Sequence, residues 1–213
     1  MKPLETSYQL RILYTEGLGR EDAEKIVSLT KNFLRFSDYK FDEFELPKEY
    51  TKKFPYLIPN EAISPEANHT HLTSFLERMR RRNELIGLLT EKPLVVEGID
   101  LEGNVYIHFG FGYSGPHYRE SKRVKLGGVA VVSSAGMGEK YIQRTAGTLL
   151  HELGELFIPF RAHCENESCF MNAPPAFYLF SISSFKRFYP LIDKQERFCN
   201  KCRRKLKIMI RER

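Results

Sequence analysis

The four cysteines of this 213-residue chain lie in its last third as two close pairs. Four residues separate Cys164 from Cys169, two separate Cys199 from Cys202, and 29 residues lie between the pairs. This spacing suits a tetrahedral zinc site with four thiolate ligands, which would force two distant segments to meet and would be closed to substrate. The alternative is four buried structural cysteines, although burial alone gives cysteines no reason to occur in close pairs.

A second cluster of metal-binding residue types begins just before the first cysteine pair, in the segment HELGE at 151–155. On a helix, His151 and Glu155 lie one turn apart on the same face, so both side chains can reach one ion, with Glu152 beside them. A hydrolytic zinc needs about three protein ligands and one open position for water, and His163 is the natural third ligand. The alternative is an ordinary amphipathic helix end with solvated glutamates and a capping histidine.

Composition and charge narrow the class of protein. With 42% hydrophobic and 13% aromatic residues, the chain suits one globular domain or a domain with a small appendage. The formal charge of +6 is modest and local, at Arg78, 80–82, 201–207 and 211–213, which indicates a solvated basic face or a nucleic-acid site. Because the sequence shows neither a leader segment nor an apolar run near 18 residues, we expect a cytoplasmic protein without membrane contact, where cysteines bind metal more readily than they form disulfides.

The order of apolar patterns predicts an α/β protein followed by a tail poor in regular patterns. We expect strands at 7–15, 39–46, 94–97, 105–111 and 129–133, a connection at 47–65 and a loop at 112–125. We expect helices at 21–36, from 68 or 73 to about 85, and at 139–158. The last of these carries the HELGE segment, and Pro159 should end it because proline cannot continue the hydrogen-bond ladder.

These motifs resemble the archaemetzincins, a small family of metallopeptidases related to the metzincins. The family pattern is HExxHxxGxxxC, then four residues, C, one residue and M, with a CxxC further on. The resemblance covers residues 129–206, and the N-terminal half only in the order of its elements. The matching positions are His151, Glu152, Cys164, Cys169, Met171, Cys199 and Cys202.

The resemblance implies a metzincin-like α/β fold with a role for each matching residue. The fold has a mixed, mostly parallel sheet with an edge strand, packed on helices that include the active-site helix. An N-terminal part at 1–158 would precede a small zinc-bearing subdomain at 159–213. The implied roles are His151 and His163 as zinc ligands, Glu152 as general base, Met171 in a Met-turn beneath the metal, the four cysteines on a structural zinc, and residues 128–133 as the edge strand that binds substrate, through Gly128, Val129, Ala130 and Val131.

The chain departs from the family pattern at the metal site. Glu155 stands where the family has its second histidine, and Ile158 and Pro159 stand where it has a glycine. Two extra residues precede His163, and the span from Met171 to Cys199 is longer. A carboxylate neutralises more of the zinc charge than imidazole does, which should raise the pKa of bound water and weaken the metal as a Lewis acid.

Three functions therefore remain open from the sequence. The first is a zinc-dependent peptidase that acts on a peptide or protein substrate, weakened by the altered ligand at Glu155. The second is an inactive family member that binds peptides without cleaving them. The third is a nucleic-acid-binding module with a zinc-stabilised basic tail; its contacts would be Arg197, Lys201, Arg203, Arg204, Lys205 and Lys207. The substrate, the role of the loop at 112–125 and the oligomeric state are not indicated by the sequence.

Overall fold

A computed structural model describes residues 2–53, 61–64, 66–67, 70–97, 105–108, 110–113, 128–158, 164–172, 186 and 188–211. The predicted ligand His163 lies outside these residues, as does most of the predicted loop at 112–125. None of the helices in the described residues combines the length and the apolarity that a membrane span requires.

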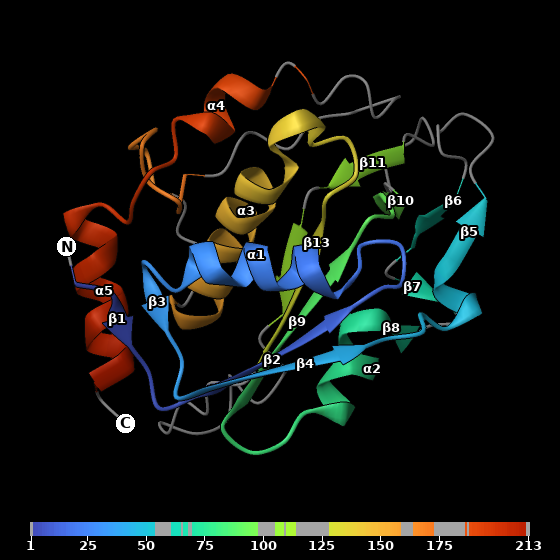
Figure 1. The fold of residues 1–213 in the computed structure, drawn as a ribbon, viewed down its shortest axis with the longest axis horizontal. Helices are drawn as coiled ribbons and strands as arrows, with labels where there is room; N and C mark the ends of the chain where they lie inside the picture. The colour runs from blue at the N-terminus through green and yellow to red at the C-terminus, as the bar shows by residue number, and fades with distance from the viewer. Residues whose placement is uncertain are drawn as a thin grey trace.

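A five-stranded sheet in the order β12-β13-β9-β2-β4 forms the centre of the molecule (Figure 1). Strands β13, β9, β2 and β4 run parallel, and β12 pairs with β13 in the antiparallel direction. The fold is therefore α/β with a mostly parallel sheet, as the sequence predicted. The strands are β2 (Gln9–Tyr14), β4 (Asp38–Glu43), β9 (Glu84–Thr90), β12 (Gly110–Tyr113) and β13 (Val129–Ser133).

Smaller sheets accompany the central one. A four-stranded sheet has the order β11-β10-β6-β5, and two further sheets are the pairs β1-β3 and β7-β8. Their strands are β1 (Leu4–Glu5), β3 (Leu34–Arg35), β5 (Thr51–Lys53), β6 (Glu61–Ile63), β7 (Glu66–Ala67), β8 (Thr70–His71), β10 (Leu94–Glu97) and β11 (Val105–His108).

Helices cover both faces of the central sheet: α1 and α3 lie on one face and α2 on the other (Figure 1). Strand residues alternate between the two faces, so Ala130 and Val132 pack in the core under α3, while Val129 and Val131 pack in the core under α2. The helices are α1 (Arg20–Thr30), α2 (Leu72–Met79), α3 (Tyr141–Phe157), α4 (Tyr189–Asp193) and α5 (Asn200–Arg211), with 3-10 turns η1 (Lys48–Tyr50) and η3 (Gly138–Lys140).

The helix that carries HELGE ends where the sequence predicted. Helix α3 stops at Phe157, and Ile158 has an extended backbone with φ −100° and ψ 110°. Proline at 159 accounts for this geometry, since the residue before a proline is pushed away from helical angles. The expected helix at 139–158 is confirmed within one turn at its start.

Several expected elements are wrong. The helix expected to continue to about residue 85 ends at Met79, and Asn83, with φ 58°, precedes the fully buried central strand β9. The helix expected at 21–36 ends at Thr30. The residues expected to form one strand at 105–111 are divided between two strands, β11 and β12. The connection expected at 47–65 contains the short strands β5 and β6.

The strand expected at 129–133 is confirmed as β13, but its expected position at the edge of the sheet is wrong. Strand β13 is paired on both sides, parallel to β9 and antiparallel to β12, and all five of its residues are buried. Within the described residues, β12 lies at that edge of the sheet. The reason for assigning substrate contacts to Gly128, Val129, Ala130 and Val131 was the edge position, and that position belongs to β12.

The C-terminal residues contain more regular structure than expected and share the main core. Helix α5 covers twelve residues of the tail. Phe170, Phe198 and Leu206 pack in the same buried cluster as Leu153 and Phe157 of α3. The division of the chain at residue 158 stays a prediction.

Candidate metal centres

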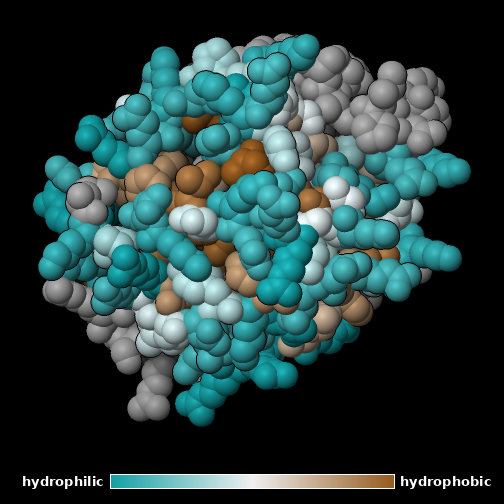
Figure 2. All heavy atoms as spheres, in the orientation of Figure 1, coloured by the Kyte–Doolittle hydropathy of each residue, from teal (hydrophilic) through white to brown (hydrophobic). Residues whose placement is uncertain are grey.

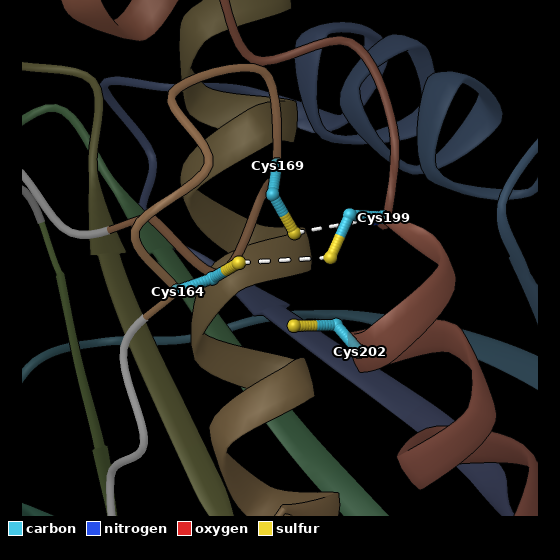
Figure 3. A group of neighbouring side chains, drawn as sticks. All are labelled: Cys164, Cys169, Cys199 and Cys202. Carbon is cyan, nitrogen blue, oxygen red and sulfur yellow. Dashed lines mark hydrogen bonds between the residues drawn. The ribbon is translucent and has the colours of Figure 1, made fainter.

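The four cysteine side chains meet at one point beside α3 (Figure 3). Cys164 and Cys169 come from the segment 164–172, Cys199 directly precedes α5, and Cys202 lies in its first turn. All four Sγ atoms lie within 4.8 Å of one another, and the four thiols are free. The Sγ atoms of Cys164 and Cys199 are 3.6 Å apart. Four ligands at about 2.3 Å from a tetrahedral zinc would lie about 3.8 Å apart, so the thiols fit this ion.

The chemistry of the thiols also fits a cation. Burial opposes ionisation of Cys199, but hydrogen bonds from the Cys202 backbone and from neighbouring thiols outweigh it and lower the pKa of Cys199 to about 7. Burial raises the pKa of Cys169 to about 11, and it also raises the pKa of Cys202. The Cys199 thiolate therefore forms readily, whereas Cys169 and Cys202 need a positive charge at the centre of the cluster to ionise.

Backbone hydrogen bonds make the segment 164–172 a closed loop fixed to the start of α5. The amide of Cys164 donates to the carbonyl of Met171 at 2.7 Å, and the side-chain amide of Asn172 donates to the carbonyl of Cys164 at 2.6 Å. The amide of Phe170 donates to the carbonyl of Arg197 at 3.0 Å, and the amide of Cys199 donates to the Sγ of Cys169 at 3.2 Å. The thiol cluster and the loop backbone thus hold each other in position.

His151 is oriented by this loop. Its Nδ1 lies 2.6 Å from the carbonyl oxygen of Phe170, and its Nε2 lies 3.4 Å from Oε1 of Glu155. A carbonyl can only accept, so Nδ1 carries the proton and Nε2 is the nitrogen that turns toward Glu155. Metal-binding histidines are commonly fixed in this way by a carbonyl on the other ring nitrogen. The pair has the arrangement of two metal ligands on one helix face.

The acidic surroundings of His151 favour a positive charge at this point. Burial works against the charged ring, but the hydrogen bond to Glu155 and the charges of Glu152 and Glu155 outweigh it and raise the pKa of His151 to about 9. The side chains of His151 and Glu155 are each 12% exposed, and Glu152 is 6% exposed. A metal ion at Nε2 would replace the proton that this environment holds in the metal-free protein.

Met171 packs directly against the helix. It is fully buried, and its Sδ lies so close to Gly154 that a Cβ at that position would overlap it. The sequence alone gave no reason for Gly154 beyond its place in HELGE, since the contact joins residues from two elements. The carbonyl of Phe170 was missed for a similar reason, because a main-chain atom leaves no signal in the residue types.

Arg144 is another residue that sequence reasoning missed. It lies two turns before His151 on α3, and its buried guanidinium contacts both oxygens of Asp193 at 2.8 Å and stacks 3.5 Å from the centre of the Tyr189 ring. The hydrogen bond and the charge of Arg144 lower the pKa of Asp193. This contact fixes α4 to α3.

The structure therefore places the predicted metal-binding residues that it describes in two groups. His151 and Glu155 face each other beside Glu152, and the four cysteines form a separate cluster joined to them by the loop at 164–172. His163 would directly precede this loop, but its position lies outside the described residues.

The described residues form an α/β fold with a mostly parallel sheet and a cluster of four thiols that could hold a metal ion. No family model matches the chain, and no curated protein matches it either. Among solved structures, it is similar to the crystal structure of Archaemetzincin (AmzA) from Archaeoglobus fulgidus complexed with malonate. The TM-score is 0.58 at 17% sequence identity, and the match covers 92% of this chain and 99% of that one. The likeness extends over the N-terminal half, where the sequence resemblance was confined to the order of elements.

Proposed function

We propose that the chain is a zinc-dependent metallopeptidase of archaemetzincin type, in which Glu155 takes the place of a histidine ligand. The observation that carries the proposal is the orientation of His151, whose Nδ1 is engaged by the Phe170 carbonyl while Nε2 is directed at Glu155. The likeness of the fold to an archaemetzincin supports the same conclusion.

Each residue has a role in this proposal. His151 and Glu155 would hold the catalytic zinc, and His163 is the third ligand expected from the sequence. When bound, the zinc would supply a polarised water molecule whose pKa lies near neutrality. Glu152 would act as the general base toward that water and as the general acid toward the leaving amine. Its burial beside His151 keeps bulk water away from the carboxylate.

The substrate in this proposal is an extended peptide that pairs with strand β12. This strand lies at the edge of the sheet within the described residues, and α3 contacts it. An edge strand offers unpaired N–H and C=O groups, to which a peptide can add as a further strand. The proposal therefore assigns substrate binding to strand β12 rather than to residues 128–133.

Metal content at each site tests the proposal together with hydrolysis. We expect two zinc ions per chain in the full protein and one in the His151→Ala variant. The full protein should cleave an unstructured peptide mixture. The Glu152→Gln variant should keep both ions but lose this cleavage. One zinc in the full protein that is lost in Cys199→Ser would show that the His151 site is empty. Two ions without cleavage, but with peptide binding, would identify an inactive family member instead.

A further inference from the structure

Helix α5 carries a charge that the proposed peptidase does not use. Of the 33 Lys and Arg residues of the chain, six lie in α5, so the remaining 27 equal the 27 Asp and Glu residues of the whole chain. No acidic residue lies within Asn200–Arg211. One twelve-residue helix therefore accounts for the net charge of +6. Its cations are Lys201, Arg203, Arg204, Lys205, Lys207 and Arg211.

One side of α5 packs against the protein core, and the opposite side faces solvent. Cys202 and Leu206 are 4% and 0% exposed, whereas Lys201, Arg204, Lys205 and Lys207 are all exposed. Within the described part of the chain, no carboxylate forms an ion pair with these four side chains. Hydrophilic residues cover the flank of the molecule on which α5 lies in Figure 1 (Figure 2).

Helix stability does not explain this charge pattern. Cations in the first turn oppose the helix dipole, which favours negative charge there. Lys201, Arg204 and Lys205 lie at spacings of three and four, where like charges destabilise a helix by about 0.2–0.5 kcal/mol per pair. A zinc ion with four thiolates would carry a net charge of −2, which at most two of the cations could offset. Among the described side chains, at least two of the four exposed cations of α5 therefore have no counter-charge.

We propose that the outer face of α5 binds the phosphate backbone of nucleic acid without reading its sequence. Twelve residues span about 18 Å, and duplex DNA presents one negative charge for about every 1.7 Å of its axis, so roughly ten charges lie along the same length. The described side chains of α5 include no aromatic residue for base stacking, which leaves the phosphates as the groups recognised.

An anionic membrane fits the same face less well. Helices that lie in a membrane interface bury an apolar side in the lipid. The apolar side of α5 is already occupied by the protein core, through Cys202 and Leu206. On its outer side, Ile208, 53% exposed, is the one large hydrophobic residue exposed in the described part of the chain.

The test is binding of the zinc-loaded full chain to a labelled 20-base-pair DNA duplex of mixed sequence, followed by fluorescence anisotropy. With four exposed cations in contact, the slope of log K against log salt should be about −3.6, which weakens binding roughly a hundredfold between 50 and 200 mM salt. The variant Lys201→Gln, Arg204→Gln, Lys205→Gln, Lys207→Gln should lose more than about tenfold in affinity at 50 mM salt and most of the slope. Its melting temperature should not fall, because like-charge repulsion is removed.

The matched control removes four other exposed cations, Arg78→Gln, Arg81→Gln, Arg82→Gln and Lys53→Gln, so its net charge is the same. Affinity within about twofold of the full chain is expected for it, because the proposal assigns binding to α5 rather than to net charge. The proposal is overturned by an unmodified chain that does not bind the duplex, by a control that loses as much as the α5 variant, or by preferential binding to phosphatidylserine vesicles or to a poly-glutamate peptide.

Discussion

At the scale of single residues, Glu155 decides how strong the proposed active site is. The Glu155→His variant should hydrolyse peptides about tenfold faster and reach its maximum at lower pH, because a neutral ligand leaves more charge on the metal to acidify bound water. The pH profile of kcat/KM measures both effects, with Glu155→Ala as the control that removes a ligand without replacing it. Equal hydrolysis by the His and Ala variants would exclude position 155 from the metal site.

Gly154 tests the packing of Met171 against α3. Gly154→Ala should lower the free energy of unfolding by about 1–3 kcal/mol, because the new Cβ overlaps Met171 Sδ and forces the loop to shift. Gly147 on the same helix is the matched control, since a Cβ there would meet its nearest neighbour, Phe170 Cε1, at an ordinary 3.9 Å. Urea denaturation should show Gly147→Ala unchanged or more stable by up to about 1 kcal/mol, since alanine favours helix. The reverse order would contradict the described contact.

The residue types predicted the cluster of four thiols, but not the main-chain atoms that contact the predicted site residues. Cysteine pairing predicted the thiol cluster, because four ligands in close pairs have few other uses, and the structure brings their Sγ atoms together. The contact of His151 with the Phe170 carbonyl was not predictable, since it depends on where a loop nineteen residues later returns to the helix. The role of His163 stays a prediction from sequence.

At the scale of elements, the ion pair between α3 and α4 should make stability depend on pH. Asp193 has a lowered pKa in the folded protein, so its contribution is present above the ordinary pKa of aspartate, about 3.9, and is lost as the pH falls through the lower folded value. Asp193→Asn should cost about 2 kcal/mol at pH 7, since it leaves the buried Arg144 without its charged partner, and less below pH 3. Chemical denaturation of both proteins at pH 7 and pH 3 measures the difference, and a constant difference would contradict it.

Because the loop at 164–172 contacts both sites, loss of a cysteine ligand should weaken metal binding at His151. Cys202→Ser should lower the melting temperature and weaken Co²⁺ binding at His151 by about tenfold, because the loop that carries the Phe170 carbonyl is no longer fixed. The absorption spectrum of Co²⁺ with nitrogen and oxygen ligands reports this site separately from thiolate bands. Lys194→Ala, which removes only an exposed ion pair with Glu167 on the outside of the loop, should leave Co²⁺ binding unchanged. Equal Co²⁺ affinity in Cys202→Ser and the full protein would show that the two sites are independent.

Helix α3 and the strands at 94–97 and 129–133 were predicted correctly from local signals, whereas the pairing order of the strands was not predictable. Helix α3 has apolar residues at helical spacing and a proline stop, and it lies where expected. Strand β9 was not predicted, and its first two residues fell within the helix expected to end at about residue 85. Its continuous apolar run, ELIGLLT, has no alternation, because the strand is buried on both faces of a parallel sheet. The edge position of β12 depends on which strands pair, and no periodicity contains that information.

At the scale of the whole molecule, one core brings the two cysteine pairs and the helix that carries HELGE together. Residues of β2, α1, α3, the loop at 164–172 and α5 belong to one buried cluster on one face of the sheet. The α/β class could be predicted from the alternation of strands and helices, whereas the contact of the tail with α3 could not be predicted from the sequence. The likeness to an archaemetzincin over 92% of the chain agrees with a single continuous arrangement of this kind.

The central claim is that the helix and the loop form a second metal site next to the thiol cluster. Anomalous diffraction at the zinc edge from crystals of the zinc-loaded protein tests it most directly. Two peaks per chain are predicted, one among the four sulfur atoms and one within bonding distance, about 2.1 Å, of His151 Nε2. A single peak among the sulfur atoms, with none at His151, would contradict the account.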